Sequence, residues 1–149
     1  GMQSPAVEDS LLAGMLHDIG KLILIVNQPT EYLQFIEAGQ AATEERVAAE
    51  EAVFGSTHGA VGAYLLGLWG LPQSVVEAVA LHNQPALQGE RVFSVLSVVH
   101  TANALVHAEE EGAVLDSLLD LDYINSIKVT EERIEIWKRL ASGLDANSN

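Results

Sequence analysis

The sequence predicts an all-α fold, and three observations support that prediction. Hydrophobic residues make up 48% of the chain and aromatic residues only 5%, which is typical of helical cores built from small and medium side chains. Apolar residues recur at intervals of three and four, and no segment alternates as a strand does. A chain of 149 residues suits one domain. We therefore predict a compact bundle of about seven helices in a single domain over residues 4–143, followed by a polar tail over residues 144–149.

The first helix is predicted over residues 4–26, with Ser4 as its N-cap and Pro5 at its first position. Apolar residues surround this segment on nearly all sides, which predicts a central helix. Two glycines interrupt it, and each costs about 1 kcal/mol relative to alanine in a helix interior. Gly14 and Gly20 therefore predict close packing of another backbone, or space beside the neighbouring polar residues.

Capping residues and glycines delimit the next three helices. A short second helix is expected to end near Gly39. Thr43 opens a third helix, which Gly55 ends, and Thr57 caps a fourth helix, which Gly70 ends. The glutamates of the third helix are expected mostly on its outer face: Glu44, Glu45, Glu50 and Glu51.

The second half of the chain predicts further helices separated by irregular segments. A helix over residues 72–82 begins at a proline and ends at a histidine, and a loop follows over residues 85–90. A long apolar helix is expected over residues 92–108. The Leu-rich segment 114–124 is weakly periodic, and Thr130 caps the last helix.

Composition excludes several classes of function. The chain contains no cysteine, which rules out disulfides, thiolate catalysis and Cys-ligated metals. Its net charge of −14 disfavours nucleic acids and anionic membranes as partners, because both require clustered Lys and Arg. No apolar run reaches the roughly 18 to 20 residues that span a bilayer, and the N-terminal residues do not resemble a signal peptide. A soluble cytoplasmic protein without membrane contact is therefore expected.

Residues 16–22 read LHDIGKL and place three polar groups in one of the most apolar stretches. Burying such a group without a partner costs roughly 2 to 7 kcal/mol. If the stretch is helical, Lys21 lies three residues from Asp18 and four from His17, so all three share one flank. The residues themselves leave two interpretations open. Either His17 and Asp18 bind a divalent metal, or Asp18 pairs with Lys21 while His17 bonds to a backbone carbonyl.

Two further histidines lie at the ends of otherwise apolar helices. His58 begins one predicted helix and His82 ends another, and antiparallel packing would bring these ends together. A single histidine on an apolar face is more often a satisfied structural residue than a ligand. Two of them in a chain with a His-Asp pair favour convergence on one site. His100 is a reserve candidate for the same cavity.

Several runs of the sequence resemble a known family. They are LAGMLHDIGKLIL, then a helix bearing Glu50 or Glu51, then STHGAVGAYLLGLWGLPQSVVEAVALHNQP, and finally VVHTANAL. Together they resemble the HD superfamily and, more closely, its HDOD branch of helical domains in bacterial signalling proteins. The resemblance covers residues 11–106 and implies an HD-domain-like helical fold.

The resemblance also implies a site. In the catalytic relatives the His-Asp doublet binds one or two divalent metals, which activate water for attack on a phosphate ester. Carried onto this chain, it implies metal ligands at His17, Asp18, His58 and His82. It also implies catalytic roles for Asp18 and for Lys21, which would hold a phosphate oxygen. The expected cofactor is a divalent ion such as Zn, Fe, Mn or Mg, or none if the site is degenerate.

The chain departs from the catalytic pattern at several positions. No histidine precedes His17, although catalytic relatives take one from an upstream helix. Asn103 stands where they carry an aspartate, and an amide is a weaker, uncharged ligand. Asn83 stands where a second histidine often follows the position of His82. The glycine-tyrosine-proline motif of the cyclic-dinucleotide phosphodiesterases is also missing.

The match also lacks the usual N-terminal helices, so the chain resembles the C-terminal part of a larger HDOD unit. Faces that such helices would cover are expected to be apolar and to acquire a partner. The expected partner is a second copy of the chain, giving a homodimer, or another signalling domain.

Three functions follow from these observations. The first is a regulatory signalling domain with a degenerate metal site, acting through protein contacts or a small ligand. The second is a metal-dependent phosphohydrolase acting on a nucleotide or another phosphate ester. The third is a structural oligomerisation bundle in which hydrogen bonds satisfy every histidine. Whether the chain is an enzyme remains open at this point.

Overall fold

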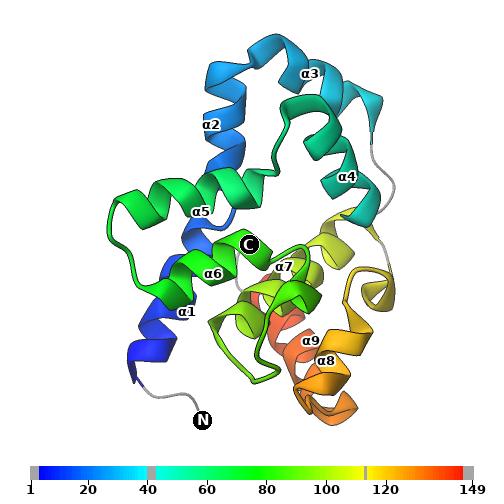
Figure 1. Cartoon of the computed structure of the whole chain (residues 1–149). Helices are drawn as coiled ribbons and strands as arrows, with labels where there is room; N and C mark the ends of the chain where they lie inside the picture. The colour runs from blue at the N-terminus through cyan, green and yellow to red at the C-terminus, as the bar shows by residue number, and fades with distance from the viewer. Residues whose placement is uncertain (1–3, 40–42, 113, 146–149) are drawn as a thin grey trace.

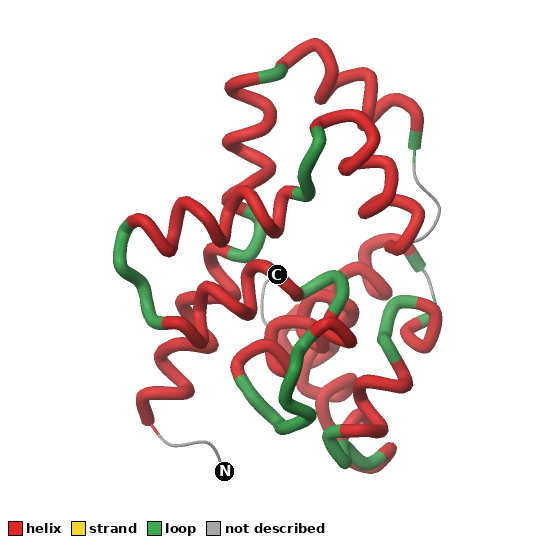
Figure 2. Tube along the Cα trace, in the orientation of Figure 1, coloured by secondary structure: helices red, strands yellow, loops and turns green. Residues whose placement is uncertain are grey.

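Helices account for all the regular structure in the part of the chain that the structure describes. The computed structural model covers residues 4–39, 43–112 and 114–145, and within these ranges it has nine α-helices, two 3₁₀ helices and no strand (Figure 2). The α-helices are α1 Ser4–Leu16, α2 Ile19–Asn27, α3 Pro29–Ala38, α4 Thr43–Phe54, α5 His58–Leu68, α6 Gln73–Leu81, α7 Val95–Glu111, α8 Leu121–Ser126 and α9 Glu131–Asp145. The 3₁₀ helices are η1 Pro85–Leu87 and η2 Leu115–Ser117. None of these helices is long and apolar enough to cross a membrane. The prediction of an all-α fold is confirmed.

The single helix predicted over residues 4–26 is wrong, because the structure divides it into α1 and α2 at His17 and Asp18. Asp18 has φ −100° and ψ 7°, in the bridge region next to the helical one. His17 Nδ1 donates to the carbonyl of Gly14 at 2.7 Å and so satisfies a carbonyl at the end of α1. The break lets α1 pack on α6 and α7 while α2 packs on α5 (Figure 1). Tertiary packing has overridden a uniformly helical local pattern.

Several predicted helix boundaries are confirmed. The Thr57 hydroxyl accepts a hydrogen bond from the backbone N–H of Ala60 at 3.1 Å and caps α5. Gly39, Gly55 and Gly70 follow α3, α4 and α5 with φ of 64°, 74° and 76°. Glycine takes this left-handed conformation without a steric penalty. Local sequence therefore determines where these helices end.

Other boundaries differ from the prediction. Helix α7 begins later than expected, because Ser94 and Ser97 form a capping box. The predicted loop over residues 85–90 includes η1. Helix α9 continues to Asp145, so the first residues of the predicted polar tail are helical. The rest of that tail, residues 146–149, lies outside the described residues.

The main core lies among α1, α5, α6 and α7, and α8 closes it with Tyr123 and Ile124. The least exposed apolar residues from the four helices include Ala13, Leu66, Val75, Ala78, Val79 and Leu96. Helices α2, α3 and α4 form an arm at the top of Figure 1. Inside the arm the rings of Tyr32, Phe35 and Phe54 pack with centroids 5.5–6.4 Å apart. The arm thus has a small aromatic core of its own.

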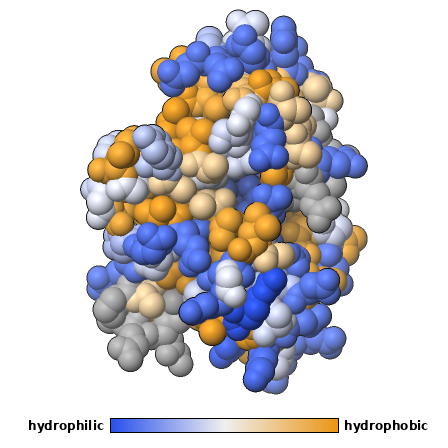
Figure 3. All heavy atoms as spheres, viewed as in Figure 1, coloured by the Kyte–Doolittle hydropathy of each residue, from blue (hydrophilic) through white to orange (hydrophobic). Residues whose placement is uncertain are grey.

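The prediction of a central first helix is wrong for α1 and α2. Leu11 and Met15 on α1 are 67% and 81% exposed, and Leu22 and Val26 on α2 are 61% and 77% exposed. Figure 3 shows hydrophobic residues gathered on the surface over α2. We call these four side chains the α1–α2 apolar face. Trp69, at 63% exposure, is likewise a surface residue and not part of the core.

Candidate functional site

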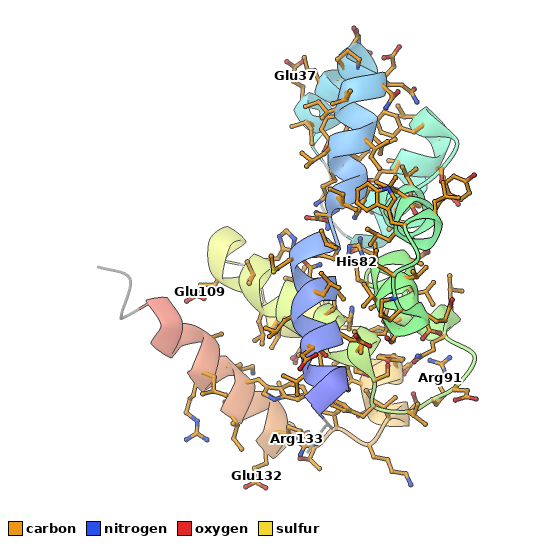
Figure 4. All side chains as sticks on the ribbon, turned by 90° about the vertical axis from the view of Figure 1, so that its left-hand side faces the viewer. Glu37, His82, Arg91, Glu109, Glu132 and Arg133 are labelled. Carbon is orange, nitrogen blue, oxygen red and sulfur yellow. The ribbon has the colours of Figure 1, made fainter. Side chains whose placement is uncertain are left out.

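Three histidines from different parts of the chain meet beside Asp18. His17 lies at the break between α1 and α2, His58 is the first residue of α5, and His82 follows the last residue of α6. The His17 and His82 ring centroids are 5.0 Å apart, and those of His58 and His82 are 5.1 Å apart. Figure 4 places His82 near the junction of α1 and α2. Packing therefore brings together the four side chains predicted as metal ligands.

A hydrogen bond from Nδ1 orients each of these imidazoles. His17 and His82 each donate from Nδ1 to the carbonyl three residues earlier, at 2.7 and 2.9 Å. His58 Nδ1 lies 2.7 Å from both carboxylate oxygens of Glu50. Carbonyl and carboxylate oxygens only accept, so Nδ1 carries a proton in all three rings. The ring orientation and the tautomer follow from these contacts.

The Nε2 atoms face Asp18 and one another. His58 Nε2 lies 3.2 Å from His82 Nε2. Asp18 Oδ1 lies 3.3 Å from His58 Nε2 and 3.8 Å from His82 Nε2, and Asp18 Oδ2 lies 3.5 Å from His17 Nε2. Histidines held through one nitrogen by a carbonyl or carboxylate, with the other nitrogen free for a ligand, are typical of metal sites.

Glu50 corrects the expectation that the α4 glutamates point outward. Its side chain is buried, with 1% exposure, and it accepts from both the ring and the backbone N–H of His58, the latter at 2.9 Å. Val47 and Phe54, three residues before and four after it, share its helix face. That spacing was the sequence signal for an inward glutamate. Glu50 fixes both the first turn of α5 and the orientation of the His58 ring.

Asp18 is held as a carboxylate by its neighbours. Lys21 Nζ donates to Asp18 Oδ2 at 2.7 Å. Burial alone would raise the pKa of Asp18, but His58 and the Lys21 ammonium outweigh it and hold that pKa well below its usual range. Asp18 Oδ1 is buried and has no hydrogen-bond partner. One oxygen of the pair is therefore satisfied, and the other is directed at the imidazoles.

The two buried imidazoles differ in their affinity for a second proton. Burial lowers the pKa of His58, but the carboxylates of Asp18 and Glu50 outweigh burial and raise it. Burial, together with the charge on His58, lowers the pKa of His82 to about 3. A proton on the cluster therefore resides on His58, and His82 stays neutral.

Asn83 belongs to the site although the sequence marked it only as a lost ligand. Its Nδ2 lies 2.9 Å from His82 Nε2 and 3.2 Å from His58 Nε2. The amide orientation follows from these contacts with ring nitrogens. Asn83 thus places an N–H donor at the point where the two rings converge. Its position directly after His82 was the available signal.

Gly20 allows α2 and α5 to approach closely enough to form the site. A Cβ on Gly20 would lie 1.9 Å from the carbonyl oxygen of His58 and 2.9 Å from the backbone nitrogen of Gly62. The predicted close backbone packing is therefore found at Gly20. It is not found at Gly14, where nothing lies within 4 Å of an added Cβ.

His100 lies outside the cluster. Its Nδ1 donates to the carbonyl of His82 at 2.8 Å, and its Nε2 accepts from the backbone N–H of Asp120 at 3.1 Å. Both ring nitrogens are occupied by backbone groups, so neither is available as a ligand. His100 instead ties α7 to the end of α6 and to the segment before α8.

The donor atoms of His17, Asp18 and His82 lie close enough together to hold a single divalent ion. Ligand atoms of His17, Asp18 and His82 all lie within 4.8 Å of one another, and His58 Nε2 is 3.2–3.3 Å from His82 Nε2 and Asp18 Oδ1. Ligands bonded at about 2.0–2.1 Å to a tetrahedral zinc ion lie about 3.3 Å apart. An ion would also satisfy Asp18 Oδ1, which has no hydrogen-bond partner.

Comparison with known families places part of the chain in a described family. A family model described as HDOD domain matches residues 1–85, which is more than half of the chain. That range contains every residue of the cluster, from His17 to Asn83. No curated protein and no solved structure gives a significant match.

Proposed function

The chain belongs to the HDOD domain family, and from this premise we propose that it is a regulatory domain of bacterial signal transduction. In this proposal the cluster around Asp18 is a degenerate HD site, and the domain acts through protein contacts or a small ligand. A cytoplasmic location is part of the proposal. The observation that carries it is the set of hydrogen bonds inside the cluster.

Protein groups already satisfy most of the atoms that would face a metal. The Asn83 amide donates to His82 Nε2 at 2.9 Å, and His58 Nε2 lies 3.3 Å from Asp18 Oδ1. The Lys21 ammonium pairs with Asp18 Oδ2 at 2.7 Å. Buried polar groups that are paired in this way need no ion for stability. The arrangement supports a polar core that persists without metal.

Charge balance supports the same interpretation. The raised pKa of His58 and the low pKa of Asp18 describe an imidazolium next to a carboxylate. Together with Lys21, a protonated His58 neutralises the carboxylates of Asp18 and Glu50. A proton on His58 Nε2 occupies the position that a metal ion would need. Protons and metal therefore compete at this atom, and metal affinity is expected to fall as the pH falls.

A metal-dependent phosphohydrolase is the second candidate, and the convergence of three oriented imidazoles favours it. His17, Asp18, His58 and His82 would hold the ion, with Zn, Fe, Mn or Mg as candidates. Such an ion supplies Lewis acidity and lowers the pKa of water. Of this chain's own groups, Lys21 would offset negative charge on a phosphate, once released from Asp18.

Metal analysis and a hydrolysis screen separate the two candidates. The protein is purified without chelator, its metal content is measured, and it is assayed with nucleotides and generic phosphate esters. We expect no turnover above that of Asp18→Ala, whether or not metal is retained. Stoichiometric metal with turnover that Asp18→Ala abolishes would instead establish a hydrolase.

The protein contacts of the proposal use the α1–α2 apolar face. Leu11, Met15, Leu22 and Val26 are each more than 60% exposed, and large exposed apolar side chains that gather on a surface are typical of interaction sites. We propose a homodimer, or contact with another signalling domain, through this face. The high negative charge argues against a nucleic-acid partner.

Light scattering tests the dimer. Met15→Lys and Val26→Lys are expected to yield monomers, whereas Val114→Lys, an equally exposed position at 71% outside α1 and α2, is expected to leave the oligomeric state unchanged. If the unmodified chain is monomeric, the homodimer is excluded and the α1–α2 apolar face is assigned to contact with another signalling domain.

A further inference from the structure

A groove between α7 and α9 combines open space with an unpaired polar group. Its volume is about 320 Å³, and the two helices that form it lie side by side in Figure 4. Val98, Thr101 and Leu105 contribute from α7, at the spacing of one helix face. Trp137 and Leu140 contribute from α9. The groove shares no residue with the cluster around Asp18.

Thr101 is the polar feature of this groove. The residue lines the groove with only 3% exposure, and its Oγ1, which is shielded from solvent, has no hydrogen-bond partner. A threonine in a helix ordinarily bonds to a carbonyl of the preceding turn. Buried hydroxyls without a partner are rare, because losing the hydrogen bonds made to water is costly. An external group that bonds to Thr101 would remove this cost.

The packing of α9 leaves the groove open. Trp137 stacks on Phe93 with ring centroids 6.2 Å apart, which anchors the middle of the helix. One turn further on, Leu140 lines the groove but is 62% exposed. Among the described residues, apolar surface on both helices is thus left uncovered beyond Trp137. A molecule that filled this space would bury the apolar surface of both helices.

Size and charge restrict what fits. Nine residues line the groove and none of them is charged, whereas a stable protein interface uses about 20 to 30 residues on each side. The volume is near the lower end of the roughly 300–1,000 Å³ typical of small-molecule pockets. A charged ligand would find no counter-ion in the lining.

We propose that this groove binds a small neutral amphiphile, with an aliphatic or aromatic body and one hydroxyl or carbonyl group. The body lies against Trp137, Leu105 and Leu140. Its polar group bonds to Thr101 Oγ1, which a change of χ1 rotamer turns toward the groove and which is able both to donate and to accept. The proposal is independent of the regulatory function proposed above, because the cluster and the groove have no residue in common.

Fluorescence of Trp137 reports on the groove directly. Trp69→Phe in the full chain removes the other tryptophan, which is surface-exposed. Titration with 1-octanol is expected to change the Trp137 emission saturably. Octanoate has the same chain length with a charged head, and it is expected to give no saturable change. Asp18→Ala is expected to leave the octanol response unchanged, which separates this proposal from the regulatory one.

Variants at Thr101 and Ala141 test the binding mode. Thr101→Val preserves shape but removes the hydroxyl, and it is expected to weaken octanol binding about fivefold, the loss of roughly one hydrogen bond. Thr101→Ser retains a hydroxyl and is expected to bind within about twofold of the parent. Ala141→Phe fills the groove and is expected to abolish the response, whereas Ala48→Phe on α4 leaves it unchanged.

Three results would overturn the proposal. One is the absence of a saturable change with octanol. Another is an equal octanol affinity in Thr101→Val and Thr101→Ser, a pair that remains informative even if Ala141→Phe fails to fold. The third is an undiminished response in a folded Ala141→Phe, which would mean that octanol partitions into the protein without using the groove.

Discussion

Two sites beside the C-terminus of α6 bury imidazoles in opposite ways. His82 and His100 are 1% and 4% exposed. His82 uses Nδ1 for a backbone carbonyl and directs Nε2 at the cluster around Asp18. His100 uses both nitrogens for backbone groups, the carbonyl of His82 and the N–H of Asp120. One ring directs a nitrogen at other polar side chains, and the other is wholly a structural link.

The comparison shows that neither residue type nor burial identifies a functional histidine. Burial lowers the pKa of both rings, so electrostatics alone does not separate them either. The partner of the second ring nitrogen distinguishes the two histidines. Where a backbone group occupies it, the histidine connects elements, and where it faces other polar side chains it forms a site. Four predictions test this difference.

The largest effect is expected from Gly20→Ala, which disturbs the close contact between α2 and α5 that forms the site. The new Cβ would lie 1.9 Å from the His58 carbonyl oxygen, and backbone cannot yield as a flexible side chain does. We expect the free energy of unfolding to fall by more than about 4 kcal/mol, measured by urea denaturation.

Gly14→Ala is the matched control in α1. Nothing lies within 4 Å of a Cβ at that position, so helix propensity is expected to stabilise the protein by up to about 1 kcal/mol. Similar losses in the two variants would mean that the α2–α5 contact does not limit stability.

Glu50→Ala is expected to cost about 3 to 4 kcal/mol, because removing one partner of a buried charged pair leaves the other uncompensated. It also frees the His58 ring from the contact that orients it. Glu51→Ala changes an exposed neighbour and is expected to stay within about 0.5 kcal/mol. Denaturation curves for the two variants provide the measurement, and equal costs would contradict the role of Glu50.

The cluster is expected to give stability a maximum near pH 6.5, the ordinary pKa of histidine. The raised pKa of His58 contributes stability that is present below pH 6.5 and is lost as the pH rises through the folded value. The pKa of His82, about 3, acts in the other direction. Between pH 6.5 and 3, His82 is protonated in the unfolded chain but neutral in the folded protein. The free energy of unfolding therefore falls by about 1.4 kcal/mol for each unit by which the pH is lowered.

Urea denaturation in chelator-containing buffer at several pH values measures this profile. His82→Gln is expected to make the acid limb less steep, because the lowered pKa of His100 still contributes there, and His58→Gln is expected to flatten the alkaline limb. An unchanged acid limb in His82→Gln would show that other groups determine the acid sensitivity.

The smallest effect is expected from His100→Leu, which tests whether His100 has a purely structural role. Two backbone groups lose their partner, and the expected cost is about 2 kcal/mol, the lower end of the range for two such groups. Zinc binding, measured by calorimetry with added ZnCl₂, is expected to match that of the parent protein, whereas His82→Gln weakens any binding found. Weaker zinc binding in His100→Leu would place His100 functionally within the cluster.

Much of the fold and part of the site could be predicted from the sequence. Thr57, Gly55 and Gly70 act through their own backbone and nearest neighbours, so their helix boundaries were predictable. The grouping of His17 with His58 and His82 came from the family resemblance together with the placement of two histidines at helix ends. Spacing alone does not establish contacts between residues so far apart in the chain.

Other features could not be predicted because they depend on distant contacts. The break at His17 and Asp18 occurs in a segment whose local pattern is uniformly helical. The pairing of Glu50 with His58 depends on where α5 begins, since its partner is the first turn of that helix. The exposure of Leu11 and Met15 depends on which surfaces α6 and α7 leave uncovered.

The sequence by itself determined that the chain is helical, where most helices end, and that it carries an HDOD signature. Only the tertiary structure decided that Asp18 lies at a turn, that Glu50 and Asn83 complete the cluster, and that His100 does not. The physical reason is the distance along the chain over which each interaction acts. Capping and helix propensity act over a few residues, whereas burial and the partner of each ring nitrogen depend on how separate helices pack.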